Sequence, residues 1–210
     1  MTWINEYQHN YYQLLMPYSS GVKRGLTEGH CQRGDGFLLM FQKLLEQRTQ
    51  NFKIIETGTL RKPGNWKDGQ SARLFTEFVD QHGGQVRSVD IDPEAVVAAR
   101  EFITSNRFSS HCSDSVEFLQ QQPDLDQVDL FYLDSWDVKW HDDSASAEHH
   151  LKEFQAIESY IKLGAIVAID DNSRFLADNR RTGKGRRIAE YLETKNKQPI
   201  YDHYQIIYQF

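Results

Sequence analysis

The 210-residue chain contains only two cysteines and no long apolar run. Cys31 and Cys112 are far apart in the sequence, so a dense disulfide framework is excluded and a reducing compartment is expected. The longest strongly apolar run, residues 165–169, is much shorter than the roughly 20 residues that span a bilayer. No Lys or Arg precedes Lys23, and no apolar segment follows Met1, which argues against a secretory signal. These absences predict a cytoplasmic protein that does not insert into a membrane.

Positive charge is also scarce. The chain has 24 Lys and Arg residues against 30 Asp and Glu residues, which gives a formal net charge of −6. Proteins that bind nucleic acid through the phosphate backbone need clustered cations, so this class of partner is not expected. The length suits one domain with one large core. We expect a single domain over residues 1–210, with a helical cap at 1–51 and a core at 52–210.

Short apolar runs alternate with helical patterns along most of the chain. A helix is predicted for residues 2–16, ended by Pro17, and another from Gly36. Seven strands are then predicted, at residues 52–56, 85–90, 108–112, 128–134, 165–170, 199–202 and 204–210. This alternation predicts an α/β fold with a doubly wound, mostly parallel seven-stranded sheet. The last two strands are too close in sequence for a crossover, so they should form an antiparallel hairpin at one edge.

Acidic residues follow four of the predicted strands. They are Glu56, Asp90, Asp134 and the pair Asp170 and Asp171. Ligands of open α/β sheets bind at the carboxyl ends of the strands, so these acids are candidates for a functional site. The alternative is that they cap the following helices.

The acids fall into two groups. Glu56 and Asp90 end the first two strands and flank Gly58, where an acid can accept hydrogen bonds from ribose hydroxyls. The loop lacks the G-x-G-x-x-G spacing of dinucleotide sites. Asp134, Asp170 and Asp171 follow strands that should be neighbours, and three converging carboxylates favour a hard divalent cation such as Mg²⁺. A solvated acidic loop is the alternative.

From about residue 34 to 210 the chain resembles the class I S-adenosylmethionine-dependent methyltransferases. It is most similar to the metal-dependent O-methyltransferases of the catechol, caffeoyl-CoA and macrolide-sugar types. The matching segments are E-T-G at 56–58, G-Q-S-A at 69–72, V-D-I-D-P at 89–93, F-Y-L-D-S-W at 131–136 and G-A-I-V-A-I-D-D-N at 164–172.

This resemblance implies a set of ligand-binding roles. The residues expected to bind S-adenosylmethionine are Glu56, Gly58, Thr59, Ser71, Asp90, Ser113, Asp114 and Trp136. Asp134, Asp170 and Asp171 are expected to bind Mg²⁺ or another divalent cation. The implied reaction is methyl transfer to a hydroxyl of a small molecule of the vicinal diol, catechol or sugar type. The metal would bind the acceptor oxygen and favour its deprotonated form.

The sequence departs from the family pattern at the general base and in the donor loop. Asp137 occupies the position of the catechol-type lysine, so Asp137, Lys139 and His141 are alternative base candidates. Residues 61–68 form an extra stretch inside the donor loop, which either reshapes the donor site or covers it.

Several other features leave alternatives open. A basic cluster either recognises an anionic group on the acceptor or is solvated surface; its members are Arg174, Arg180, Arg181, Lys184, Arg186 and Arg187. The aromatic residues near the N-terminus pack onto the body or onto a second copy in a homodimer. His149 and His150 are expected on a helix surface. The competing functions are a nucleotide-binding oxidoreductase and a non-catalytic S-adenosylmethionine-binding module.

Overall fold

The protein is described from a computed structural model that covers residues 2–15, 33–66 and 70–210. Several residues used in the sequence predictions lie outside these ranges: Pro17 as a helix end, Cys31, and Gly69 of the G-Q-S-A segment. Residues 67 and 68 of the extra stretch also lie outside them. No helix within the described ranges is long and apolar enough to cross a membrane.

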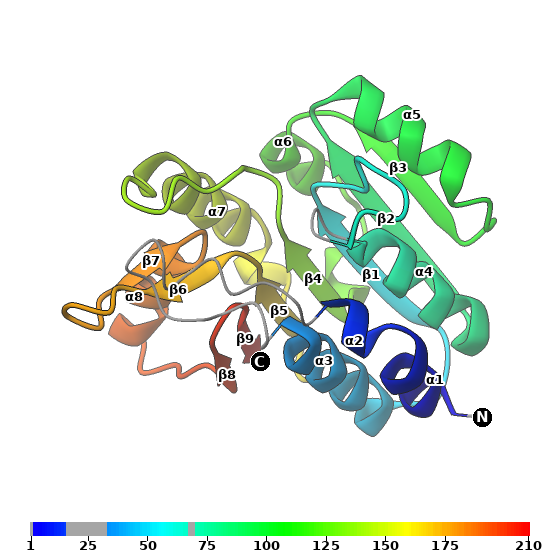
Figure 1. The fold of residues 1–210 in the computed structure, drawn as a ribbon, viewed down its shortest axis with the longest axis horizontal. Coiled ribbons are helices and arrows are strands. Elements are labelled where there is room, and N and C mark those ends of the chain that lie inside the picture. Colours follow the sequence, from blue (N-terminus) through cyan, green and yellow to red (C-terminus); the bar gives the residue numbers. More distant parts are fainter. Residues whose placement is uncertain (1, 16–32, 67–69) are drawn as a thin grey trace.

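A seven-stranded sheet forms the centre of the molecule (Figure 1), in the order β3-β2-β1-β4-β5-β9-β8. Its strands are β1 (Phe52–Thr57), β2 (Gly84–Asp90), β3 (Phe108–Cys112), β4 (Leu130–Leu133), β5 (Ile166–Ile169), β8 (Tyr201–Asp202) and β9 (Ile206–Gln209). The first five pair in parallel, whereas β9 is antiparallel to both β5 and β8. The predicted mostly parallel sheet with an antiparallel edge hairpin is therefore confirmed.

Helices cover both faces of this sheet (Figure 1). One face packs against α1 (Trp3–Asn10), α3 (Arg33–Gln47) and α4 (Ser71–His82). The other packs against α6 (Ser115–Gln120), α7 (Ser144–Ile157) and α8 (Arg186–Thr194). Along β4, Leu130 and Tyr132 belong to the first core and Phe131 and Leu133 to the second, which explains why the central strands are continuously apolar.

The remaining elements are short or peripheral. They are α2 (Tyr12–Leu15), α5 (Pro93–Phe102), the 3₁₀ turns η4 (Leu125–Gln127) and η5 (Glu158–Tyr160), and a two-stranded hairpin of β6 (Asn172–Arg174) and β7 (Arg181–Gly183). The sequence did not predict this hairpin, because its three-residue strands lack a repeated apolar pattern. It lies between β5 and α8 in the chain, so it follows directly on the predicted metal segment.

The N-terminal aromatic residues belong to the core of this chain. Trp3 and Tyr7 are fully buried, and both rings pack against Phe41 of α3. This confirms the alternative in which they pack onto the body. The boundary at residue 51 and the homodimer remain predictions.

Two aspartates cap helices that follow strands of the sheet. Asp92 accepts a 2.9 Å hydrogen bond from the backbone N–H of Glu94 at the start of α5. Asp114 accepts hydrogen bonds of 2.9 and 3.1 Å from the N–H groups of Val116 and Glu117 in α6. The carboxylate of Asp114 thus stabilises the start of α6.

Candidate active site

A cavity of about 510 Å³ lies at the carboxyl ends of β1, β2, β4 and β5. It borders the position between β1 and β4 where the strand order reverses, which is where open α/β sheets bind their ligands. The residues that line it form two groups. Those after β1 and β2 were predicted to bind the donor, and those after β4 and β5 were predicted to bind a metal.

The donor side is built on a close approach of two loops. Gly58 has φ of +80°, and a Cβ added to it would lie 2.7 Å from the carbonyl oxygen of Asp134. Its N–H donates a 2.7 Å hydrogen bond to the carbonyl of Val89. Only glycine meets both requirements without strain. Main-chain atoms therefore form the cavity wall at this point, so a ligand can approach the backbone closely.

Asp90 is held in place by backbone amides. Its two carboxylate oxygens accept hydrogen bonds from the N–H of Thr59 at 3.1 Å and of Asp92 at 2.9 Å. Burial raises its pKa, and these two hydrogen bonds act in the opposite direction. Thr59, Asp90 and Ser71, the first residue of α4, all line the cavity.

Glu56 lies beneath this site. It is 1% exposed and accepts a 2.8 Å hydrogen bond from Ser88 on β2. Burial raises its pKa to about 8, although hydrogen bonds from Ser71 and Ser88 oppose the shift. Glu56 does not line the cavity. Its carboxyl group instead supports Ser71, which lines the cavity.

Of the last three residues predicted to bind the donor, Trp136, Ser113 and Asp114, only Trp136 lines the cavity. Trp136 is 51% exposed, lines the cavity and packs against the ring of His149 at 5.2 Å between centroids. Ser113 and Asp114 do not line the cavity; the N–H of Ser113 donates to the carbonyl of Asp90 at 3.1 Å. Their roles in donor binding remain predictions.

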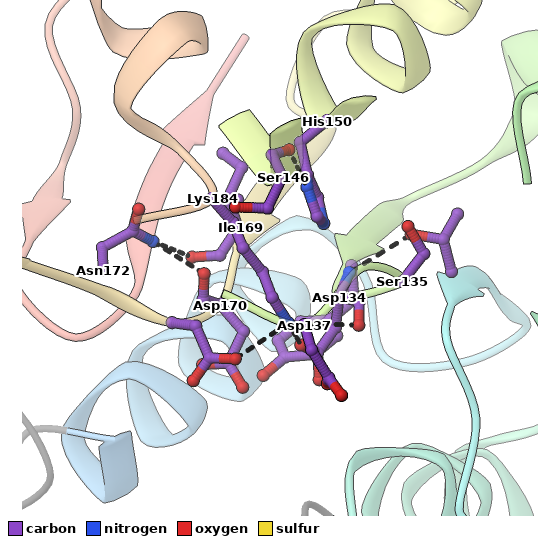
Figure 2. A network of polar contacts seen from close by, with 12 residues as sticks. Asp134, Ser135, Asp137, Ser146, His150, Ile169, Asp170, Asn172 and Lys184 are labelled. Atoms are coloured by element: carbon purple, nitrogen blue, oxygen red, sulfur yellow. Dashed lines mark hydrogen bonds and ion pairs between the residues drawn. The ribbon is translucent and has the colours of Figure 1, made fainter. Parts of the chain in front are cut away.

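The three predicted metal ligands come together, but with a lysine among them. Asp134, Asp170 and Asp171 all line the cavity, and the side chain of Lys184 extends into their midst (Figure 2). Its ammonium group contacts Oδ1 of Asp134 and lies 2.8 Å from Oδ2 of Asp171. Only 2% of this side chain is exposed. Within the described ranges there is no group of three or more His, Cys, Asp or Glu residues arranged to hold a metal ion.

A second cation neutralises the third carboxylate. Arg33, the first residue of α3, donates a 2.6 Å hydrogen bond to Oδ2 of Asp170, and both side chains are buried. The hydroxyl of Tyr204 donates to Oδ1 of Asp171. Four carboxylate oxygens of the predicted metal site are thus engaged by donors of the protein itself. In this arrangement the donor set does not fit a divalent ion.

The buried charges shift one another strongly. Burial raises the pKa of Asp134 to about 7, although Lys184 acts in the opposite direction. Burial also acts on Asp171, but Lys184 outweighs it and holds the pKa of that carboxyl well below its usual range. Burial lowers the pKa of Lys184, but Asp134 and Asp171 outweigh this and raise it above its ordinary value. Lys184 is therefore a permanent cation of the site.

Of the three base candidates, only Asp137 lines the cavity. It is exposed and forms a 3.1 Å ion pair with Arg61 of the extra donor-loop stretch. Lys139 and His141 are exposed and lie outside the cavity wall, and His141 packs against Phe175 of the hairpin loop. The structure therefore keeps Asp137 next to the site and separates the other two from it.

The basic cluster is paired with acids. Arg174 and Arg181 both contact Asp202, at 2.6 and 2.8 Å, and Arg186 contacts Asp143 at 2.8 Å. The other members pair as Arg180 with Asp178, Arg187 with Glu148 and Glu190, and Lys184 with Asp134 and Asp171. This pairing favours a structural role for the cluster.

One prediction outside the cavity is wrong. His150 is fully buried rather than on a helix surface, and His149 is half-buried. The reason is the helix period: His150 lies on the same face of α7 as Phe154 and Ile157, which pack into the core.

No protein-family profile and no curated sequence matches the chain, but solved structures do. It superposes on a candidate rRNA methylase from Clostridium thermocellum with a TM-score of 0.55 at 12% identity, over 85% of this chain and 97% of that one. The chain has the fold of the class I S-adenosylmethionine-dependent methyltransferases. A candidate methyltransferase from Streptococcus mutans, crystallised with S-adenosylhomocysteine, gives a TM-score of 0.53 at 11% identity, over 82% and 96% of the chains.

A match to MycE, a methyltransferase of the mycinamycin biosynthetic pathway solved with Mg and S-adenosylhomocysteine, has 19% identity and a TM-score of 0.43. It covers 62% of this chain and 30% of that one, so this chain spans under a third of the length of MycE. The fold assignment rests on the two superpositions with TM-scores of 0.55 and 0.53, and identities of 12% and 11% extend it to nothing beyond the fold.

Proposed function

We propose that the protein is an S-adenosylmethionine-dependent methyltransferase that acts on a hydroxyl oxygen of a small molecule. The observation that carries this proposal is the single cavity that joins the two halves of the predicted site. Gly58, Ser71 and Asp90 line one side of it, and the aspartates after β4 and β5 line the other. Its volume of about 510 Å³ is within the range of small-molecule pockets.

The donor would bind on the side of β1 and β2. Asp90 would accept hydrogen bonds from the ribose hydroxyls, and the start of α4 at Ser71 would receive the amino-acid carboxylate. Trp136 offers an exposed aromatic face on the adenine side. The sulfonium would then lie towards Asp134, where the donor side of the cavity meets the acidic cluster.

The chemistry is an in-line displacement. The bond between the methyl carbon and sulfur breaks, a bond from that carbon to the acceptor oxygen forms, and S-adenosylhomocysteine leaves. The acceptor's proton must pass to a base, and of the three base candidates Asp137 is the one next to the cavity. Alignment of donor and acceptor supplies most of the rate in such a transfer.

The family resemblance implies the acceptor class, a hydroxyl of a vicinal diol, catechol or sugar. A group of this size suits the cavity of about 510 Å³. The net charge of −6 makes a nucleic-acid acceptor a poor candidate. The cations of the 174–187 cluster already have acidic partners, so this region gives an anionic acceptor little support.

Calorimetry tests the donor assignment. S-adenosylhomocysteine should bind the wild type, and Asp90→Ala should weaken binding at least tenfold, because two ribose hydrogen bonds to a charged acceptor are lost. As a control, Asp126→Ala changes an exposed acid that does not line the cavity, and it should bind S-adenosylhomocysteine like the wild type. Binding of NAD(H) without S-adenosylhomocysteine would instead identify a nucleotide-binding oxidoreductase.

Methyl transfer needs its own assay. Label should pass from S-adenosylmethionine to at least one member of a panel of diols, catechols and sugars. Binding of S-adenosylhomocysteine without transfer to any of them would favour the non-catalytic binding module.

A further inference from the structure

The most unusual feature of the site is a buried lysine where the family resemblance implies a metal ion. The ammonium group of Lys184 bridges Asp134 and Asp171, which come from the ends of two neighbouring strands, β4 and β5. A divalent ion held by these same two carboxylates would have to occupy the same space. Lysine and metal are therefore alternatives at this position.

The backbone around Lys184 fixes the lysine in place. The N–H of Gly183 donates a 2.8 Å hydrogen bond to Asp143, and the N–H of Gly185 donates a 2.7 Å hydrogen bond to the side chain of Asn172. The N–H of Lys184 itself donates to the carbonyl of Asp171 at 3.2 Å. These contacts hold the β7–α8 connection against the end of β5. The lysine is thus built into the fold and does not reach the site from a free surface loop.

A close backbone approach supports the same arrangement. Gly183 has φ of +120°, and a Cβ there would lie 2.2 Å from the carbonyl oxygen of Asp171. Only glycine allows the hairpin to approach the acidic pair this closely, and the next residue is the one whose ammonium enters the cluster.

The chain itself supplies most of the counter-charge of the acidic cluster. Three carboxylates face two buried cations, Lys184 and Arg33, so the cluster keeps at most one net negative charge. A divalent ion added beside these two cations would have to overcome their repulsion at short range. Buried acids need partners to stay charged, and here the chain supplies them.

We propose that the ammonium of Lys184 takes the place of a divalent cation, so that this site operates as a metal-independent acceptor site. The inference rests on the proposed methyltransferase function. It changes what the acceptor must offer: without a metal to chelate, one hydroxyl that reaches the acidic cluster is sufficient, and a second vicinal oxygen is not required.

The test is to remove the lysine and ask whether a metal enters. The full-length wild type, stripped of metal with a chelator, should show no binding of Mn²⁺ below about 1 mM by electron paramagnetic resonance. Lys184→Met keeps the side-chain length but leaves Asp134 and Asp171 facing each other without a cation. This variant should bind Mn²⁺ at least tenfold more tightly than the wild type.

Controls separate the site from the surface. Lys152→Met removes an exposed lysine from α7 and should not create Mn²⁺ binding. If Lys184→Met is unstable, Mn²⁺ should raise its melting temperature and leave that of the wild type unchanged. Tight Mn²⁺ binding by the wild type that is lost in Asp134→Asn overturns the proposal. So does a Lys184→Met variant that gains neither Mn²⁺ binding nor stabilisation by Mn²⁺.

A second measurement on the same samples tests the proposed function separately from the role of Lys184. Calorimetry with S-adenosylhomocysteine, with and without chelator, reports on the donor site alone. Absence of S-adenosylhomocysteine binding would overturn the methyltransferase proposal, whereas the Mn²⁺ titrations would still decide what occupies the acidic cluster.

Discussion

The hydroxyl of Ser135 donates a 2.6 Å hydrogen bond to Oε1 of Glu153, which fastens the loop after β4 to the middle of α7. The other oxygen of Glu153 accepts a 3.2 Å hydrogen bond from Thr57 at the end of β1. Glu153 is fully buried. One carboxylate thus ties together the two strand ends that carry Gly58 and Asp134, and it shapes the cavity without lining it.

Removing this carboxylate should weaken both the fold and the site. Glu153→Ala takes this acceptor away from the buried hydroxyl of Thr57 and the half-buried hydroxyl of Ser135, so the free energy of unfolding should fall by about 3 kcal/mol. Urea denaturation measures this. Affinity for S-adenosylhomocysteine should fall as well, because Trp136 follows directly on Ser135. Gln155→Ala, at an exposed position of the same helix, should change neither quantity, and an unaltered affinity in Glu153→Ala would contradict a positioning role.

Two glycines of the donor loop form a matched pair for testing the close approach at the cavity. Gly58 and Gly64 have similar positive φ angles, +80° and +74°. An added Cβ at Gly58 meets the carbonyl of Asp134 at 2.7 Å, whereas at Gly64 it meets nothing within 4 Å. Both alanine variants should lose about 1 kcal/mol from the left-handed backbone.

The difference in stability and affinity between the two variants measures the effect of the close approach between Gly58 and Asp134. Gly58→Ala should lose a further 1–3 kcal/mol of stability from overpacking, on the order expected for a tight interior. It should also bind S-adenosylhomocysteine at least tenfold more weakly, since the loop must move away from Asp134. Gly64→Ala should keep its affinity. Equal effects of the two substitutions in calorimetry would show that the close approach is not needed.

The buried pair of Arg33 and Asp170 should be strongly coupled. Arg33→Met leaves the buried carboxylate of Asp170 without its ion-pair partner, which should cost about 3–5 kcal/mol of stability. Adding Asp170→Asn removes the unpaired charge, so the double variant should be more stable than the sum of the two single effects predicts. A double-mutant cycle in urea measures this coupling.

An exposed ion pair provides the reference. Lys43 and Glu46, at 2.7 Å on the surface of α3, should show a coupling below about 0.5 kcal/mol in the same cycle. If Arg33 and Asp170 couple no more strongly than this pair, they do not form the buried ion pair described above.

The central strands β1, β4 and β5 could be predicted from the sequence because they are buried on both faces and are therefore continuously apolar. The predicted strand at 108–112 coincides with β3, and the antiparallel β8–β9 hairpin followed from the short connection. The β6–β7 hairpin was missed, because its position depends on contacts with distant residues such as Asp143 and not on an apolar pattern.

The acidic residues of the site were predicted from the sequence, but the cations that pair with them were not. Asp134, Asp170 and Asp171 stand at strand ends, where topology alone brings them together. Arg33 and Lys184 are 151 residues apart in the sequence and resemble ordinary surface cations there. The one available signal was physical: three converging carboxylates need a counter-charge, and the chain itself can supply it.

His150 should make stability depend on pH. It is fully buried, and burial lowers its pKa to about 4, against about 6.5 for an exposed histidine. Between these values the unfolded chain binds a proton that the folded chain does not, so stability should fall as the pH drops from 6.5 towards 4. This difference in pKa corresponds to a full effect of roughly 3 kcal/mol. Below pH 4 this contribution should be fully lost.

The measurement is a series of urea denaturations between pH 4 and 8, compared with His150→Gln. The glutamine keeps a donor for the carbonyl of Ser146, to which Nδ1 of His150 lies at 2.7 Å, but it cannot titrate. Its slope of stability against pH between 4 and 6.5 should therefore be shallower than that of the wild type. Glu153 adds a loss of its own at lower pH, because its pKa is lowered despite burial, first by His150 and then by hydrogen bonds from His149, Ser115 and Ser135. Only the part that comes from these hydrogen bonds remains in His150→Gln. Identical slopes in the two proteins would mean that His150 is already protonated in the folded state, held by its 3.8 Å contact with Glu153.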